Sequence, residues 1–168
     1  MVKNLAMSRQ HLENRLKELH SESFGWAKHC CGGDIELATE ALQESYLKVL
    51  EGRAKFSGKS EFKTWFFAVL RYTILDMKNA SKKWIWSEYS NLELKQDQPE
   101  NYAHKPIYDK IGSALSELSE KQHSIVHLVF YQQMTLDQAA SAMGISGGAA
   151  RQHYHRAKLK LKDLLSDG

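Results

Sequence analysis

The sequence predicts an all-α protein of two small helical domains joined by a flexible linker, the C-terminal one a helix-turn-helix. Apolar residues recur at three- and four-residue spacing along most of the 168 residues, and no alternating, strand-like pattern of useful length is present. The chain contains only two prolines. A polar stretch over residues 84–106 interrupts the periodicity. We therefore expect a first domain over residues 1–83, a linker over 84–106 and a second domain over 107–168.

The composition excludes several classes of protein. Hydrophobic residues make up 42% and charged residues 26%, as in an ordinary globular domain. No apolar run approaches the roughly 18 residues of a membrane span, and the N-terminus lacks the apolar core of a signal peptide. We therefore expect a cytoplasmic protein without membrane insertion. The adjacent Cys30 and Cys31 cannot form a disulfide framework.

A metal or redox role for His29–Cys31 is a lesser alternative. Structural zinc sites use about four ligands, usually with spaced cysteine pairs, and no second pair exists here. Small buried hydrophobic residues at a helix end are the better interpretation of the two cysteines. We expect no metal, no cofactor and no catalytic residues, because no nucleophile, base and orienting acid occur at a recognisable spacing.

Charge is distributed unevenly, although the formal net charge is only +3. Residues 34–51 carry five acids and one base, whereas residues 53–83 carry eight bases and two acids. Residues 146–165 carry five bases and one acid. The two basic blocks suggest two contacts with a polyanion. The acidic block suggests docking against a basic protein surface, with a merely solvated helix face as the alternative.

The first domain is expected to begin with helical structure over residues 8–31, with an uncertain break near Ser21–Ser23. Gly32–Gly33 are placed to end it. Asp34 is a suitable N-cap for the next helix, which runs to about Gly52. The buried stripe of that helix is expected to contain Ile35, Ala38, Leu42, Tyr46 and Val49.

A basic loop, Arg53–Ser60, follows, and Ser60 is expected to cap a long helix over residues 61–83. Basic side chains interleaved with aromatic ones suit single-stranded nucleic acid, because cations hold phosphates and aromatic rings hold unstacked bases. The alternative is that the aromatic residues are all core, which we expect of Trp65 and Phe66 more than of Tyr72. The inward face is expected to comprise Phe62, Trp65, Phe66, Val69, Thr73 and Met77.

The second domain ends in a predicted helix-turn-helix. Thr135 and Ser146 are suitable N-caps, and Gly144 can take the positive φ of the turn between the two helices. The last helix has a basic face, the arrangement that places a helix in the DNA major groove. An ordinary helical hairpin with a solvated basic face is the alternative. Residues expected to pack are Ile107, Ile111, Ala114, Leu115 and Leu118, then Ile125, Leu128, Val129 and Tyr131, then Leu136, Ala139, Ala140 and Met143, and finally Ala150, Tyr154, Ala157, Leu161 and Leu164.

Three segments together resemble the extracytoplasmic-function (ECF) sigma factors of bacterial RNA polymerase, small members of the primary sigma family. They are ELATEALQESYLKVLEG (Glu36–Gly52), SEFKTWFFAVLRYTILDMKN (Ser60–Asn79) and the segment Leu115–Leu161. They are similar to that family's "DLVQETFL", "SFRTWLYRIARNLAID" and "LGISxGTVKSRLHRAR" patterns, in the family's order. The resemblance covers most of the chain.

The resemblance implies a role for each segment. The helix of the first segment, Glu36–Gly52, would dock on the largest subunit of the core polymerase, through Glu40, Gln43, Glu44 and Lys48. The basic loop and the long helix would bind the opened non-template strand of the −10 promoter element, through Phe56, Lys59, Lys63, Arg71, Tyr72 and Asp76. The last helix would bind the −35 element as duplex, through Gly148, Ala149, Arg151, Gln152, His155 and Arg156. An anti-sigma protein is a further partner that the resemblance implies.

The sequence departs from the family pattern at two places. Gly147-Gly148-Ala149-Ala150 replaces a run that usually carries a valine and a threonine, and His153 stands where an arginine is common. Two glycines inside a helix each cost about 1 kcal/mol, but at its N-terminus they also let the backbone approach a phosphate. The competing hypothesis is a stand-alone helix-turn-helix regulator of duplex DNA, which leaves the acidic helix and the basic loop without a role.

Overall fold

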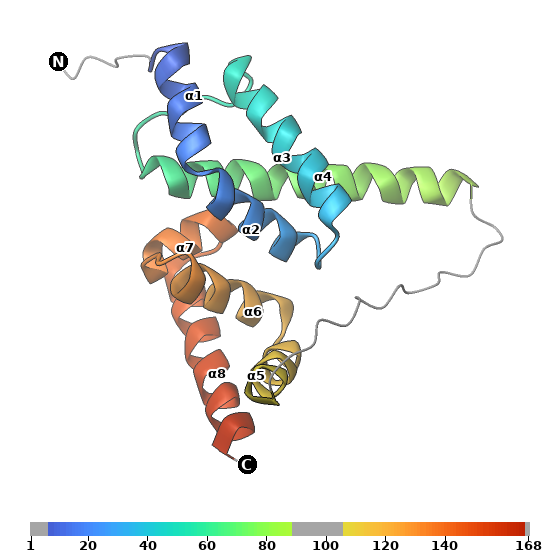
Figure 1. The fold of residues 1–168 in the computed structure, drawn as a ribbon, viewed down its shortest axis with the longest axis vertical. Helices are drawn as coiled ribbons and strands as arrows, with labels where there is room; N and C mark the ends of the chain where they lie inside the picture. Colours follow the sequence, from blue (N-terminus) through green and yellow to red (C-terminus); the bar gives the residue numbers. More distant parts are fainter. Residues whose placement is uncertain (1–6, 89–105, 167–168) are drawn as a thin grey trace. The chain divides into compact units, whose positions relative to one another are not determined.

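The computed structural model describes residues 7–88 and 106–166, and its elements are helices throughout these ranges (Figure 1). The chain forms two compact units. The first contains α1 (Arg9–Glu18), α2 (His20–Cys30), α3 (Ile35–Leu50) and α4 (Phe62–Glu88). The second contains α5 (Pro106–Ser116), α6 (Glu120–Val126), the π-helix η1 (His127–Tyr131), most of α7 (Leu136–Met143), and α8 (Gly147–Ser166). The all-α class is confirmed.

Capping side chains start the first helices of unit 1 as their sequences indicate. The Ser8 hydroxyl accepts a hydrogen bond from the His11 amide at 3.3 Å, and the Asp34 carboxylate accepts one from the Leu37 amide at 3.0 Å. The break between α1 and α2 lies at Leu19, before the expected Ser21–Ser23. Backbone hydrogen bonds continue on both sides of Leu19, so the break is a bend of the chain without a loop.

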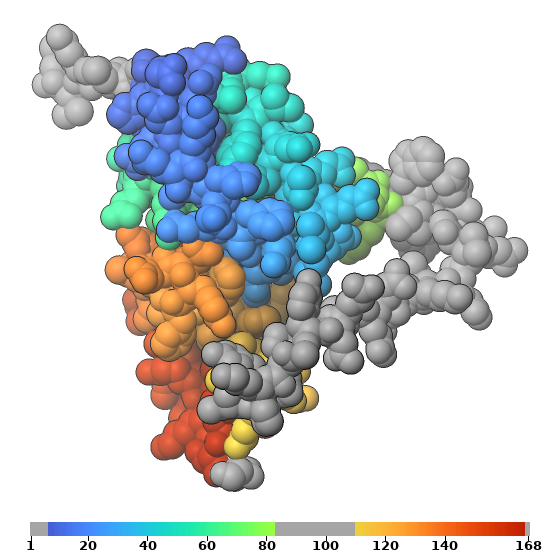
Figure 2. All heavy atoms as spheres, in the orientation of Figure 1, coloured from blue at the N-terminus to red at the C-terminus, as the bar shows by residue number. Residues whose placement is uncertain are grey.

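Helix α4 provides the core of unit 1. Its Phe62, Phe66, Phe67, Leu70 and Ile74 are all fully buried, so its apolar face is wider than the expected stripe. Trp26 of α2 stacks on Phe67 with ring centroids 5.9 Å apart, and its indole N–H donates to the Phe67 carbonyl at 3.1 Å. Helix α3 packs on the same core, and Figure 2 shows α1 and α3 side by side on one face of the unit.

The ends of α4 differ from the expected ones. The helix begins at Phe62, and the Ser60 hydroxyl donates to the Glu61 carbonyl instead of capping the first turn. The helix also continues to Glu88, five residues beyond the expected end at residue 83. Residues 84–88 contain no glycine or proline, so the backbone hydrogen-bond ladder can continue although the apolar pattern fades. The remainder of the predicted linker, residues 89–105, lies outside the described residues.

One residue expected in the buried stripe of α3 is exposed. Ile35 is 60% exposed because it is the first residue of the helix and precedes the part that packs. Ala38, Leu42 and Val49 are buried as expected, whereas Tyr46 is half-buried.

Capping boxes and a left-handed glycine define the helix-turn-helix of unit 2. Ser119 and Gln122 exchange hydrogen bonds at the start of α6, and Thr135 and Gln138 do so before α7. Gly144 has a φ of 65°, and the Ser146 hydroxyl accepts from the amide of Ala149. The predicted turn and its caps are therefore confirmed.

Three apolar residues of unit 2 are more exposed than expected. Tyr131 is 68% exposed, and Ile111 and Leu164 are exposed as well. Tyr131 ends η1 and lies about 120° around the helix axis from the buried Ile125 even by an α-helical count, so it falls outside the buried face. Ile125, Leu128, Ala150 and Ala157 are fully buried.

Gln133, after η1, has a φ of 56°, in the left-handed region that a side chain disfavours. We expect Gln133→Gly to raise the free energy of unfolding of unit 2 by about 0.5–1 kcal/mol, because glycine adopts this conformation without steric cost. Urea unfolding of the full chain, followed by NMR signals of α8, measures this change. Gln152→Gly, within α8, is the matched control and should lower stability by about 1 kcal/mol. Lower stability of Gln133→Gly would contradict the expectation.

Burial, together with the nearby His123, lowers the pKa of His127 from its usual 6.5 to about 4. Between these two pH values the unfolded chain takes up a proton that the folded chain does not, so the stability of unit 2 should fall as the pH falls. His127→Gln should reduce this slope in the same urea experiment, whereas the exposed His155→Gln should keep it. An unchanged slope in His127→Gln would contradict the assignment.

Candidate functional site

A groove of about 480 Å³ runs between α3 and α4 within unit 1, and the expected polymerase-binding residues lie along it. Glu40 and Gln43 are exposed, whereas Glu44 and Lys48 are half-buried. The groove therefore brings these four residues of α3 together with Asp76, which was assigned to the −10 element. It is lined by Glu40, Gln43, Glu44, Leu47, Lys48, Thr73, Asp76, Met77 and Ala80.

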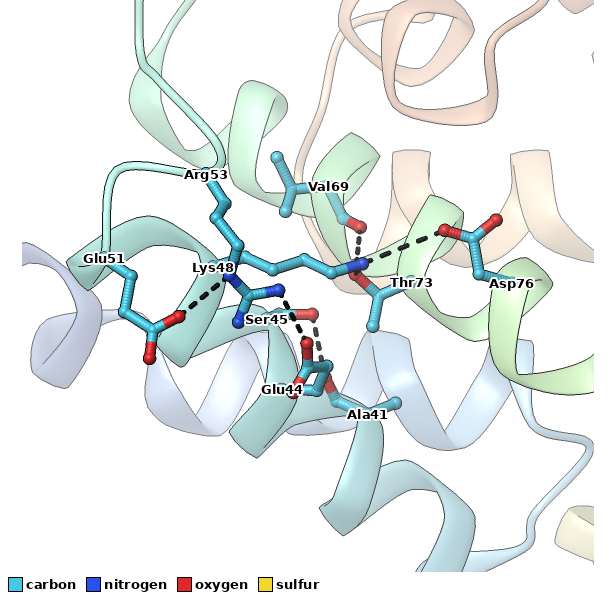
Figure 3. Close-up of polar contacts among 9 residues, drawn as sticks. All are labelled: Ala41, Glu44, Ser45, Lys48, Glu51, Arg53, Val69, Thr73 and Asp76. Atoms are coloured by element: carbon cyan, nitrogen blue, oxygen red, sulfur yellow. Dashed lines mark hydrogen bonds and ion pairs between the residues drawn. The ribbon is translucent and has the colours of Figure 1, made fainter. Parts of the chain in front are cut away.

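Lys48 connects the two sides of this groove (Figure 3). Its ammonium group donates to the Thr73 hydroxyl at 3.1 Å and lies 3.8 Å from a carboxylate oxygen of Asp76. The Thr73 hydroxyl in turn donates to the Val69 carbonyl at 2.9 Å, so its oxygen is free to accept from Lys48. Lys48 thus contacts α4 across the groove.

Arg53 forms a second set of ion pairs just beyond the C-terminal end of α3. Its guanidinium contacts Glu44 at 3.0 Å and Glu51 at 2.8 Å, and these hydrogen bonds raise its pKa (Figure 3). The backbone turns back at this point, because Gly52 has a φ of 73° and the Ala54 amide donates to the Lys48 carbonyl. Arg53 therefore links the basic loop to Glu44 of the acidic helix.

Phe56 and Lys63, both assigned to the −10 element, are half-buried and contact other residues of unit 1. Phe56 is half-buried and packs against Phe62 and Trp65, with ring centroids 5.3 Å and 5.2 Å away. Lys63 forms an ion pair with Glu22 at 2.9 Å. Phe56 thus anchors the loop on the start of α4.

Of the other residues of this group, Arg71 is half-buried and the remaining three are exposed. Tyr72 is 55% exposed, unlike the buried aromatic residues of α4, and the Arg71 guanidinium lies 5.7 Å from the centre of its ring. Lys59 and Asp76 are also exposed. Tyr72 and Asp76 are four residues apart and so lie on one face of the helix.

The residues assigned to the −35 element share one exposed side of the first half of α8. Gly148, Arg151, Gln152, His155 and Arg156 are exposed, and Ala149 is half-buried. A Cβ on Gly148 would meet nothing within 4 Å, whereas one on Gly147 would lie 3.2 Å from the Asp137 carboxylate. The Asp137 carboxylate ends an exposed side chain that can move aside, so nothing in the described residues requires glycine at either position.

Three interactions at the candidate sites of the two units could not be read from residue spacing. The Arg151 guanidinium lies 3.6 Å from the carboxylate of Asp137 on α7, which sequence reasoning did not single out. Glu44–Arg53 and Lys48–Thr73 likewise join residues that only the turns of the chain bring together. The opposite charges of Asp137 and Arg151 could have suggested this ion pair, but many other acid–base pairs in the sequence are equally compatible with one.

The cysteine pair lies at the end of α2. Burial raises the pKa of the Cys31 thiol, and Lys78 donates to the Cys30 carbonyl at 2.6 Å. In residues 7–88 and 106–166, no group of three or more His, Cys, Asp or Glu is arranged to hold a metal ion. Among the described helices, none is long and apolar enough to cross a membrane.

Two family models match the chain, one in each unit. The model described as Sigma-70 region 2 matches residues 16–84, and the model described as Sigma-70, region 4 matches residues 114–163. The chain therefore belongs to the sigma-70 family, whose members are non-catalytic DNA-binding regulators.

Similarity to known proteins identifies the subgroup of the family to which the chain belongs. It is similar to RNA polymerase sigma factor YlaC of Bacillus subtilis, with 29% identity over 133 residues covering 76% of this chain and 77% of the relative. It is also similar to ECF RNA polymerase sigma factor SigF of Caulobacter vibrioides, with 29% identity over 134 residues covering 79% and 72%. Within its family the chain is an ECF sigma factor, which directs RNA polymerase to promoters.

A solved structure shares the fold. The sigma factor RpoE, in complex with the anti-sigma factor NepR from Bartonella quintana, has a TM-score of 0.68 at 20% identity, covering 92% of this chain and 96% of that one. A stand-alone helix-turn-helix regulator is not favoured, since such a protein would not account for the match to region 2.

Proposed function

We propose that the two units divide promoter recognition between them, with unit 1 holding both the polymerase and the opened −10 strand. Glu40, Gln43 and Glu44 on α3 bind a basic surface of the core polymerase. The basic loop and the exposed face of α4 bind the non-template strand. The first half of α8 binds the −35 duplex. No residue of the chain performs covalent chemistry, and the protein acts in the cytoplasm.

The pairing of the exposed Tyr72 with the half-buried Arg71 is the observation that carries this proposal. The other aromatic residues described on α4 are buried or half-buried, whereas Tyr72 presents its ring to solvent beside a guanidinium. An aromatic ring can stack on an unpaired base for about 1–3 kcal/mol, and a neighbouring cation attracts the phosphates. Such a surface binds an opened strand better than a duplex whose bases remain stacked. It therefore favours strand opening without chemistry.

The position of this pair relative to the docking residues supports a shared site. Asp76, one helical turn beyond Tyr72, lines the same groove as Glu40 and Glu44. Polymerase bound along α3 would therefore lie beside the strand bound on α4. Arg53 supports the same arrangement, because its contact with Glu44 holds the basic loop against the docking helix.

On α8 the proposed base-reading residues are Arg151 and Gln152. Arginine pairs with guanine and glutamine with adenine in the major groove, each through two hydrogen bonds. The ion pair with Asp137 is exposed at both partners, so an approaching base edge or phosphate can replace it at little cost.

We also propose that an anti-sigma protein restrains this factor. The support is the likeness to the sigma factor RpoE, which was solved in complex with the anti-sigma factor NepR. The fold is also shared by CnrH, solved in complex with the cytosolic domain of CnrY, with a TM-score of 0.62 at 16% identity.

Run-off transcription with core polymerase tests the polymerase-docking assignment. The purified chain should direct transcription from its promoters, and Glu44→Lys should lower both transcript yield and affinity for core about tenfold or more, because a like charge then faces the basic surface. Arg53→Ala is the matched control, since it breaks the same internal ion pair but retains Glu44, and it should bind core normally. Normal core affinity of Glu44→Lys, or equal loss in both variants, would contradict the assignment.

Arg151→Ala should weaken binding of the holoenzyme to promoter DNA by about 1–3 kcal/mol and relax preference at one base pair of the −35 element. Competition binding with single-base variants of the promoter measures both effects. Lys162→Ala, also an exposed base of α8, is the control and should leave sequence preference unchanged. An unchanged preference in Arg151→Ala would place this side chain away from the base edges.

A further inference from the structure

We propose that Lys48 does not bind the polymerase but neutralises Asp76 and positions it at the −10 surface of α4. This inference rests on the proposed function of unit 1, and it removes one residue from the set that the family resemblance implies for docking. Lys48 is thus a positioning residue for strand binding, although it lies on the docking helix.

The Lys48 ammonium contacts residues of α4 and is not directed to the outer face of α3, where the polymerase is proposed to bind. Its side chain is 23% exposed, whereas that of Asp76 is 76% exposed. Its ammonium is directed across the groove, where Thr73 accepts one of its three donors and Asp76 lies next to it (Figure 3). Thr73 is itself buried and fixed by its bond to Val69. Binding a partner would require Lys48 to leave this buried acceptor, which costs free energy.

The charge of the groove shows what Lys48 does for Asp76. Among the described lining residues, Lys48 is the one base beside three acids, Glu40, Glu44 and Asp76. The nearby Arg53 is already bound to Glu44 and Glu51. Without Lys48 the groove would therefore present uncompensated negative charge at the edge of α4.

That edge is where a polyanion is expected to lie. Asp76 is one turn from Tyr72, so its carboxylate lies close to the path of the strand that stacks on Tyr72. An unpaired Asp76 carboxylate at this position would repel the phosphates of the strand. Paired with the Lys48 ammonium, it has a net charge close to zero and repels them much less. The 3.8 Å ion pair also keeps the Asp76 carboxylate near the Lys48 ammonium.

A double-mutant cycle on the reconstituted holoenzyme tests this role. The variants are Lys48→Met, which removes the charge but keeps the apolar stem, Lys48→Arg, Asp76→Asn, and Lys48→Met with Asp76→Asn. Two affinities are measured for each variant: that of the chain for core polymerase, and that of the holoenzyme for a labelled single-stranded −10 oligonucleotide. Thermal unfolding of each variant shows whether it folds.

We expect Lys48→Met to keep its affinity for core and to bind the oligonucleotide about threefold to tenfold more weakly. Asp76→Asn should restore binding in the double variant, because the uncompensated charge is gone, and Lys48→Arg should resemble the unaltered chain. Higher salt should reduce the defect of Lys48→Met, because it screens the repulsion.

Three results would overturn the proposal. The first is weaker binding of Lys48→Met to core polymerase, and the second is unchanged binding of the oligonucleotide by Lys48→Met. The third is a loss of oligonucleotide binding that persists in the double variant with Asp76→Asn, as a misfolded Lys48→Met chain would also show. Glu44→Lys and Tyr72→Ala, measured in parallel, test the underlying function separately. Normal core binding by the first or normal oligonucleotide binding by the second would reject the assignment of α3 or α4 itself, whatever Lys48 does.

Discussion

The packing of α4 against α2 and α3 is the constraint on which the rest of unit 1 depends. Trp26 stacks on Phe67 in nearly parallel planes and donates its N–H to the carbonyl of the same residue. Tyr46 of α3 stacks on Phe66 with centroids 5.7 Å apart. Burying large aromatic side chains on both sides of one helix fixes its rotation about its axis, because a small rotation would leave a cavity. That rotation decides that Tyr72 is exposed while Phe66, Phe67 and Leu70 are buried.

In the proposed function, this constraint connects polymerase docking on α3 to strand binding on α4. Since α3 and α4 share one core, the acidic residues of α3 and the exposed face of α4 keep a fixed relation, and the polar contacts of Lys48 across the groove reinforce it. A sigma factor must hold a polymerase surface and a DNA strand at the same time. Two helices packed on common aromatic residues achieve this without a moving part.

Helical periodicity was sufficient to predict the helices, most caps and the turn of the helix-turn-helix, because these features depend on neighbouring residues. Asp34, Thr135 and Ser146 cap the helices that they were expected to cap. The sequence-based predictions were wrong for the exposure of several side chains and for the end of one helix. Tyr131, at the end of η1, is exposed, and α4 continues past residue 83 because no glycine or proline there ends the helix. For the site, spacing indicated which side chains share a face, but not that Lys48 and Arg53 are engaged by Thr73, Asp76, Glu44 and Glu51.

The central claim is that unit 1 presents to DNA a surface suited to unpaired bases. The most direct measurement compares the affinity of the holoenzyme for the −10 non-template strand as a labelled single strand with its affinity for the same sequence as a duplex, by fluorescence anisotropy. The promoter sequence for this comparison comes from the transcription start sites that appear when the protein is overproduced. The account predicts tighter binding of the single strand. Equal affinity, or a preference for the duplex, would contradict it.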